Sequence, residues 1–306
     1  MASFLLRRLL LAVPLALGVV LLTIASLDLI PGDPAALMLG QSATKAAVEE
    51  LRSNLRLDDP LLVRYARYVT GLVQGDFGTS FREHRKISAI LSETLPYTLQ
   101  LAAAAITLAV LLGIPLGLLA GSRPGSFIDG LIRLVSLVGL SMPVFWTGLL
   151  LMVFFSVNLG WLPVAGAGTW KHLVLPSVTL ALPSLAVVAR MTRSGVLEVQ
   201  REEYIRTAAA KGLGRRSILY KHTLRNALVP VVTALGLELG QMLGGAVLTE
   251  TVFAWPGIGR LTIYSIFNRD YILVQGLVVV LALIYIGVNL LIDASYGLID
   301  PRITYS

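Results

Sequence analysis

The chain alternates long apolar runs with short polar stretches, and this pattern predicts its elements. A helix of about 20 apolar residues, rising about 1.5 Å per residue, crosses the hydrocarbon core of a bilayer. Six runs reach or approach that length and are predicted to be membrane-spanning helices: 9–30, 97–120, 134–159, 173–189, 229–249 and 272–292. The fourth run is the shortest and contains Pro176 and Pro183, so a buried helix of a soluble core is its alternative.

The composition agrees with this interpretation. Of the 306 residues, 56% are hydrophobic and 14% are charged, and the mean hydropathy is +0.77, whereas soluble domains average about 25% charged residues. The chain is therefore predicted to be an all-α, polytopic membrane protein. It has no cysteine, which excludes disulfides, thiolate nucleophiles and cysteine-based zinc sites. Its three histidines, His84, His172 and His222, lie far apart in the sequence, so no metal site is expected.

The distribution of lysine and arginine predicts the orientation, because cytoplasmic loops carry an excess of both. With the N-terminus inside, segment 190–228 alone holds nine of them, whereas the short outer loops hold only Lys171, Arg260 and Arg269. Both termini and segment 190–228 are therefore predicted to be cytoplasmic, and segment 31–96 extracytoplasmic. Nucleic-acid binding is the other interpretation of the net charge of +7. The excess of basic residues inside already explains that charge, so no nucleic-acid partner is expected.

The N-terminal third of the chain holds one apolar run and one long polar segment. Arg7 and Arg8 precede the run, as in a cleaved signal peptide, but the run exceeds the about 7–15 residues of a signal core. An uncleaved signal anchor is therefore favoured. Segment 31–96 then shows amphipathic helical patterns at 44–57 and 60–72. These helices are predicted to lie against the membrane or the protein, either handling substrate or serving as a structural cover.

Two runs carry glycine at every fourth position. Since glycine lacks a Cβ atom, such a row lets a neighbouring helix approach closely. Both runs are therefore predicted to pack within a tight bundle. The rows are Gly113, Gly117 and Gly121 in the second run, and Gly236, Gly240 and Gly244 in the fifth.

The fifth run also has a polar face, roughly opposite its glycine row at about 100° per residue. An ionisable group in mid-membrane costs about 2.5–3.5 kcal/mol and usually faces a cavity or pathway. This face is therefore predicted to line a translocation path, and a hydrogen bond to a neighbouring helix is the alternative. The predicted path residues are Glu238, Gln241 and Gly245, with Ser141 of the third run and Asn289 of the sixth as weaker candidates.

Segment 203–230 is a polar, basic island between two apolar runs. It reads EYIRTAAAKGLGRRSILYKHTLRNALVP, and it predicts two short helices around Gly212-Leu213-Gly214, since glycine tolerates positive φ. A small, alanine-rich helix would fit a groove on another protein; a solvated loop resting on anionic lipid headgroups is the alternative. The predicted contact residues are Glu203, Arg206, Ala208, Ala209, Lys211, Gly212 and Leu213.

The chain lacks the residues of an energy-converting enzyme. It contains no phosphate-binding loop of the form G-x-x-x-x-G-K-[ST], and no credible catalytic triad or carboxylate pair. No cofactor is therefore expected in this chain. If ATP drives its activity, a separate polypeptide that docks on the basic island must hydrolyse the ATP.

Short motifs follow one another in a fixed order: PGDP at 31–34, GDFG at 75–78, LP at 95–96, MPVFW at 142–146, ARMTRS at 189–194, YIRTAAAKG at 204–212, HTLRNALVP at 222–230, GGAV at 244–247, ETVF at 250–253, WPG at 255–257, RDY at 269–271 and DPR at 300–302. Each motif alone is weak, but their shared order covers most of the chain. Together they resemble the dipeptide and oligopeptide permeases of ATP-binding-cassette (ABC) importers, in the subunit with a long first outer loop.

The basic island differs from the general ABC permease loop, which reads E-A-A, three residues, Gly, nine residues, then I-x-L-P. When Gly212 is matched to that glycine, Ala208 and Leu224 also match, but the acidic and proline positions do not. This departure resembles the peptide subgroup. It leaves open which residues touch the ATPase.

The resemblance implies a fold, partners and a function. The fold would comprise residues 1–30 with the first helix, a helical extracytoplasmic insertion at 31–96, a permease core at 97–292 and a cytoplasmic tail at 293–306. The partners would be a second homologous permease subunit in a heterodimer, two ABC ATPases that bind ATP and Mg²⁺, and an extracytoplasmic binding protein, at the bacterial inner membrane. The implied function is ATP-driven import of dipeptides or oligopeptides. Import of nickel or glutathione, and transport driven by an ion gradient, are the alternatives.

Overall fold

The computed structural model describes residues 2–29, 31–40 and 43–299, and every regular element in those residues is a helix. This confirms the predicted all-α class. The helices form two compact units, one comprising Met1–Thr98 with Pro256–Ala294 and the other mainly Leu99–Trp255. The first unit therefore combines an N-terminal and a C-terminal part of the chain.

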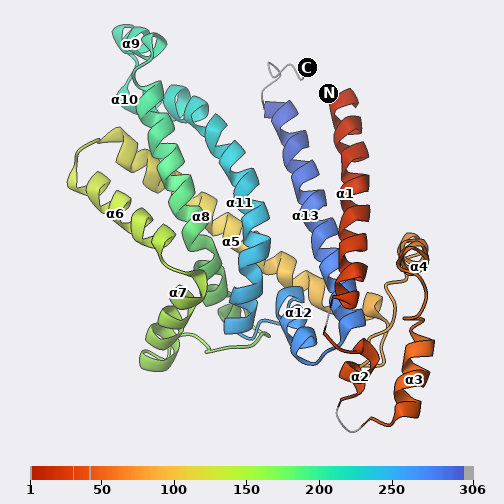
Figure 1. The fold of residues 1–306 in the computed structure, drawn as a ribbon. Helices are drawn as coiled ribbons and strands as arrows, with labels where there is room; N and C mark the ends of the chain where they lie inside the picture. The colour runs from red at the N-terminus through yellow and green to blue at the C-terminus, as the bar shows by residue number, and fades with distance from the viewer. Residues whose placement is uncertain (1, 30, 41–42, 300–306) are drawn as a thin grey trace. The chain divides into compact units, whose positions relative to one another are not determined.

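Four helices in the described residues are long and apolar enough to cross a membrane (Figure 1): α1 (Ala2–Asp28), α5 (Ile87–Ser122), α8 (Trp170–Val199) and α13 (Tyr271–Ile299). Two bent pairs bring the number to six if each pair is one span. The first pair is α6 (Phe127–Ser141) with Val144–Asn158, which begins as α7 (Val144–Leu151). The second pair is Arg215–Met242 with Gly244–Val252, so its bend lies within α11 (Arg225–Val252), the helix that follows α10 (Arg215–Ser217). All six predicted runs are therefore helical. Several helices extend beyond the predicted runs; for example, α5 begins at Ile87 and α8 continues to Val199.

The third predicted run is not one straight helix. α6 and α7 meet at an angle of 109°. Pro143 lies at this bend, and Met142 before it has extended backbone, with φ −85° and ψ 133°. Proline disfavours helical geometry in the preceding residue and has no N–H of its own, which accounts for the break. A π-helical stretch, Met152–Asn158, continues α7.

The first unit contains the insertion between α1 and α5, which is helical as predicted. Its helices are α2 (Pro34–Leu39), α3 (Lys45–Asn54) and α4 (Leu61–Val73), and α12 (Ile258–Phe267) belongs to the same unit. The apolar face of α4 packs on Val20 and Ile24 of α1 and on Val279 of α13. Figure 1 shows α1 and α13 side by side, and their packing positions the insertion at the C-terminal end of α1.

The second unit is built on close contact between α5 and α8, and this confirms the prediction for the second run. A Cβ atom on Gly113 would lie 2.8 Å from Val188, and one on Gly121 would lie 2.8 Å from Val196. A Cβ atom on Gly117 would collide with the carbonyl oxygen of Ala189. Only glycine therefore allows the two helices to approach this closely.

The glycine prediction for the fifth run is wrong at Gly244. Gly244 is exposed, and no atom lies within 4 Å of the position that its Cβ would take. The close approach occurs at Gly245 instead, where a Cβ would lie 3.2 Å from Leu180 of α8. The packed face of α11 is therefore rotated toward the face that was predicted to be polar.

Candidate functional site

The basic island folds as two short helices around a glycine turn, as predicted. α9 (Glu203–Ala210) is followed by Gly212 with φ +81° and by α10, and a π-helical stretch, Ile218–Leu224, then leads into α11. Hydrogen bonds from Gly212 N to Ala209 O (3.0 Å) and from Leu213 N to Ala208 O (3.3 Å) close the turn. Positive φ is strained for any residue with a side chain, so glycine at 212 is what allows this geometry.

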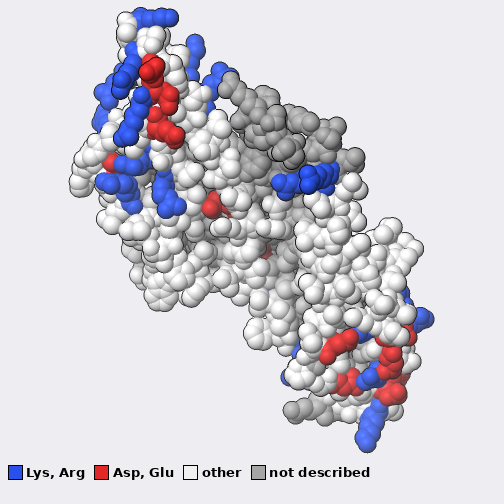
Figure 2. All heavy atoms as spheres, turned by 45° about the horizontal axis from the view of Figure 1, so that its top comes forward, with Lys and Arg blue, Asp and Glu red and all other residues white. Residues whose placement is uncertain are grey.

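The exposed side of this turn, which we call the coupling surface, holds six of the seven predicted contact residues. They are Glu203, Arg206, Ala209, Lys211, Gly212 and Leu213. Ala208 differs, because it is only 8% exposed and lies with Ile205 on the buried face of α9. In this structure Ala208 therefore packs the helix onto the protein rather than offering a contact. Figure 2 shows lysine and arginine gathered at this end of the second unit.

A packed core supports the coupling surface. Leu118 of α5, Val196 of α8 and Ala227 of α11 are buried together, and Leu219 and Leu224 of the π-helical stretch that follows α10 pack against them. A hydrogen bond of 2.7 Å from Asn226 Nδ2 to the hydroxyl oxygen of Tyr204 joins α11 to α9. The sequence pattern did not single out Tyr204 and Asn226 for this contact, although both lie in motifs shared with the peptide permeases. The surface is thus linked directly to a long helix of the same unit.

The predicted path residues of α11 lie in different environments. Glu238 is buried, and its carboxylate accepts a hydrogen bond from Ser184 of α8. The sequence analysis gave two interpretations of Glu238, lining of a path and a hydrogen bond to a neighbouring helix, and this contact is the second of them. Gln241, by contrast, is exposed, and Gly245 packs near Leu180. Glu238 and Gln241 therefore do not form one polar face within this chain, and lining of a path by either stays a prediction.

The two weaker path candidates make local contacts. Ser141 donates to the carbonyl of Leu137 at 2.8 Å, beside the bend between α6 and α7. Asn289 belongs to the other unit and donates to the carbonyl of Tyr285 at 3.0 Å. Both bonds satisfy the side chain within its own helix.

A buried ion pair that the sequence pattern did not reveal joins α6 to α8. Asp129 is fully buried and accepts from Arg193 Nε at 2.6 Å and from its terminal nitrogen at 3.0 Å. It also accepts from the backbone N–H of Gly125 at 3.0 Å. This two-pronged contact fixes both distance and orientation. Arg193 lies in the ARMTRS motif, and this motif was the one feature of the sequence that drew attention to Arg193.

A second buried carboxylate connects two segments of the first unit. Asp270 is 1% exposed and accepts from Ser80 Oγ at 2.5 Å, from Arg82 N at 3.1 Å and from Leu273 N at 3.2 Å. These bonds tie the chain that leads into α5 to the start of α13. Asp270 is the middle residue of the RDY motif, and these hydrogen bonds give it a structural role.

Comparison with known proteins identifies the family of this chain. Residues 113–305 match the family described as the inner membrane component of binding-protein-dependent transport systems, and residues 1–102 match its N-terminal part. The chain belongs to this family. The match to this transport permease family contains the coupling surface, the Asp129–Arg193 pair and all of α11, whereas its N-terminal part contains the insertion.

Relatives of this permease are similar along the whole chain. The dipeptide transport system permease protein DppB of Alkalihalophilus pseudofirmus is 40% identical, with both chains covered completely. The glutathione transport system permease protein GsiC of Salmonella paratyphi A is 42% identical with the same coverage. Among solved structures, a chain of the MetNI methionine ABC transporter in an inward-facing conformation matches with a TM-score of 0.58 and 19% identity over 69% of this chain and 96% of that chain. The fold is therefore that of an ABC importer permease.

Proposed function

We propose that this permease is one of two pore-forming subunits of an ATP-driven importer of short peptides at the bacterial inner membrane. The relatives that match it from end to end are described as permeases for dipeptides and for glutathione, which is itself a short peptide. The observation that carries the proposal is the coupling surface. It is an exposed pair of short helices on a packed core, in a chain without a phosphate-binding loop.

The proposed assembly places the coupling surface and both termini in the cytoplasm and the insertion outside. A second homologous permease completes the pore, two ATPases that bind ATP and Mg²⁺ dock below it, and an extracytoplasmic binding protein delivers the solute. ATP binding must then favour one pore conformation over the other through differential contacts. The Tyr204–Asn226 bond offers a direct route, because it connects α9 to the helix that carries Glu238 and Gln241.

The test is uptake into vesicles that contain the permease with its partner permease, ATPases and binding protein. We expect accumulation of a labelled dipeptide against its gradient only when ATP, the ATPases and the binding protein are all present. Uphill transport by the permease alone would refute the proposal and would favour a transporter driven by an ion gradient.

Glutathione is the second candidate solute, because a glutathione permease is as similar to this chain as the dipeptide permease is. The binding protein decides between them, since it selects the solute before the pore receives it. Titration of that protein with dipeptides, longer peptides, glutathione and nickel chelates should give one class with clearly tighter binding. Selective binding of a nickel chelate would contradict the peptide assignment while leaving ATP-driven import intact.

A further inference from the structure

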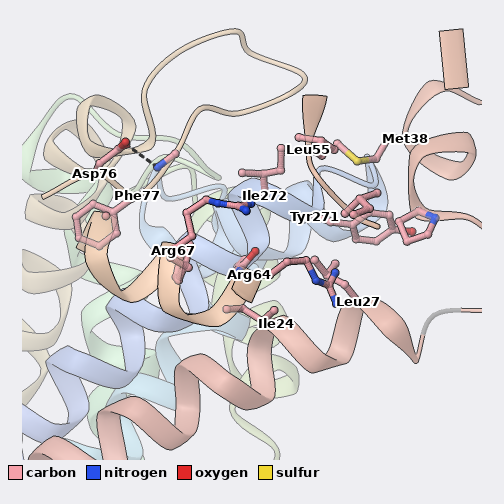
Figure 3. A pocket seen from close by; sticks show the side chains of 16 residues that line it. Ile24, Leu27, Met38, Leu55, Arg64, Arg67, Asp76, Phe77, Tyr271 and Ile272 are labelled. Carbon is pink, nitrogen blue, oxygen red and sulfur yellow. Dashed lines mark hydrogen bonds between the residues drawn. The ribbon is translucent and has the colours of Figure 1, made fainter. Parts of the chain in front are cut away.

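A cavity of about 260 Å³ lies inside the first unit, where the end of α1, the insertion and the start of α13 meet. Its wall is mainly apolar. Figure 3 shows Ile24 and Leu27 of α1 and Ile272 of α13 around it, together with Met38 and Leu55 of the insertion. The volume is close to the lower end of the range for small-molecule pockets, about 300–1,000 Å³.

Two buried hydrogen-bond donors of α4 border this cavity. The Arg64 side chain is only 9% exposed, and its terminal nitrogen donates to Asp28 at 2.5 Å. Its Nε–H is buried as well and has no acceptor among the described residues. Tyr68 lies one helical turn further along α4, and its buried hydroxyl likewise has no partner in the described part of the chain. Both residues line the cavity, so the two donors share one face of the helix.

Tyr68 remains a donor at neutral pH. Burial, followed by the negative charge of Asp76, raises the pKa of the Tyr68 phenol to about 12. Buried polar groups in folded proteins nearly always have a hydrogen-bond partner. Two such donors at one apolar cavity therefore point to a ligand that supplies an acceptor.

The charges around the cavity select the kind of acceptor. Arg64 is paired with Asp28, and Arg67, the other arginine in the wall, is paired with Asp59. Asp76 accepts a backbone N–H of its own turn at 3.0 Å and adds a negative charge to the wall. An anionic ligand would meet the negative charge of Asp76, while both arginines of the wall are already paired with carboxylates. A neutral oxygen avoids this repulsion and can accept from the two unpartnered donors of α4, and the side chains of Tyr271 and Gln275 also line the cavity.

We propose that this cavity binds a neutral carbonyl group carried on an apolar body. The carbonyl oxygen accepts from Arg64 Nε–H and from the Tyr68 hydroxyl, while the apolar part packs on Ile24, Leu27 and Met38. This chemistry has two sources, namely the peptide group beside an aliphatic side chain, and the acyl ester of a phospholipid in the membrane that α1 crosses. The proposal concerns a second site and does not depend on which solute is imported.

The test uses the assembled transporter in lipid nanodiscs, with N-acetyl-L-leucinamide as the neutral probe and saturation-transfer NMR as the readout. We expect saturable binding. The Tyr68→Phe variant, which loses only the hydroxyl, should weaken it about three- to tenfold, the worth of one hydrogen bond. Tyr65→Phe is the matched control, because Tyr65 lies on the same helix and donates to the carbonyl of Leu17, outside the cavity. It should bind like the wild type.

Native mass spectrometry of the same three proteins separates the two sources. A phospholipid retained by the wild type and by Tyr65→Phe but lost from Tyr68→Phe, and displaced by the amide, identifies the lipid ester. Amide binding with no retained lipid identifies the peptide group. The proposal is overturned if neither ligand binds saturably, if Tyr68→Phe matches the wild type, or if the carboxylate N-acetyl-L-leucine binds more tightly than the amide. Transport is measured separately, so a failure here leaves the proposed import function standing.

Discussion

At the scale of single residues, Gly212 decides the backbone of the coupling surface. Its φ of +81° lies in the region that residues with a Cβ atom avoid, at a cost of about 1–2 kcal/mol. Gly212→Ala should therefore distort the turn between α9 and α10 and lower ATP-dependent peptide uptake several-fold. Uptake is to be measured per molecule inserted in the membrane, so that a loss of protein is not counted as a loss of coupling.

Gly214 provides the matched control for this prediction. No atom lies within 4 Å of the Cβ position at either glycine, but Gly214 has φ −63°, which alanine adopts readily. Gly214→Ala should therefore transport like the wild type. Equal uptake by the two variants would show that the conformation of residue 212 does not matter for coupling.

Tyr68 predicts a pH dependence at the same scale. Its phenol has a pKa of about 12 in the folded protein because of burial and the charge of Asp76, against about 10 for an unperturbed tyrosine. Because the folded state holds this proton more tightly, the phenol contributes stability fully below pH ~10 and loses it as the pH rises toward 12. The difference in absorbance at 295 nm between wild type and Tyr68→Phe should titrate near pH 12. A titration midpoint near 10 would contradict the burial of this hydroxyl.

At the scale of elements, the contact between α5 and α8 holds the second unit together. Gly117→Ala places a methyl group against the Ala189 carbonyl and about 2.6 Å from Thr192 Cβ, so the helices must separate. We expect a loss of about 1–3 kcal/mol in the free energy of unfolding, typical of overpacking. Denaturant titration in detergent would measure it.

The control for this contact is Gly130→Ala in α6, where the Cβ position is open. Alanine is the better helix former by about 0.5–1 kcal/mol, so this variant should be as stable as the wild type or slightly more stable. If both alanine variants gain stability, α5 and α8 do not approach as closely as described.

Asp270 joins two elements of the first unit through bonds to Ser80, Arg82 and Leu273. Asp270→Ala leaves these buried donors unpaired, and we expect it to destabilise the unit by about 3 kcal/mol. Thermal unfolding in detergent is the measurement. Glu93→Ala removes a carboxylate from an exposed pair with Arg85, and it should cost at most about 1 kcal/mol. Similar losses in the two variants would argue against a locking role for Asp270.

At the scale of the whole molecule, the predicted orientation is directly testable because the chain has no cysteine. A single cysteine at an exposed position can therefore be labelled without a background. In right-side-out membrane vesicles, an impermeant maleimide should label Glu49→Cys of the insertion at once and Arg216→Cys of α10 only after permeabilisation. Labelling in the reverse order would place the coupling surface outside and would remove the basis for docking of a cytoplasmic ATPase.

Much of the fold could be predicted from one-dimensional pattern, because the features concerned are local. The length of the apolar runs predicted the six helical segments, and the spacing of glycines predicted the close contact of α5 at Gly117. The turn between α9 and α10 was predicted because glycine at position 212 tolerates positive φ. The pairs that fix the tertiary structure could not be predicted in this way. Asp129 and Arg193 are 64 residues apart, Ser184 and Glu238 are 54 apart, and Ser80 and Asp270 are 190 apart.

The sequence by itself determined that this is a multi-span helical membrane protein, because the length and apolar character of its runs are properties of the chain. Only the tertiary structure decided which side of each helix is buried. It placed Glu238 against α8 and Ala208 on the buried face of α9, and it showed the close approach at Gly245 instead of Gly244. The physical reason is that the burial of a helix face depends on the neighbour that packs on it, and that neighbour comes from a distant part of the chain.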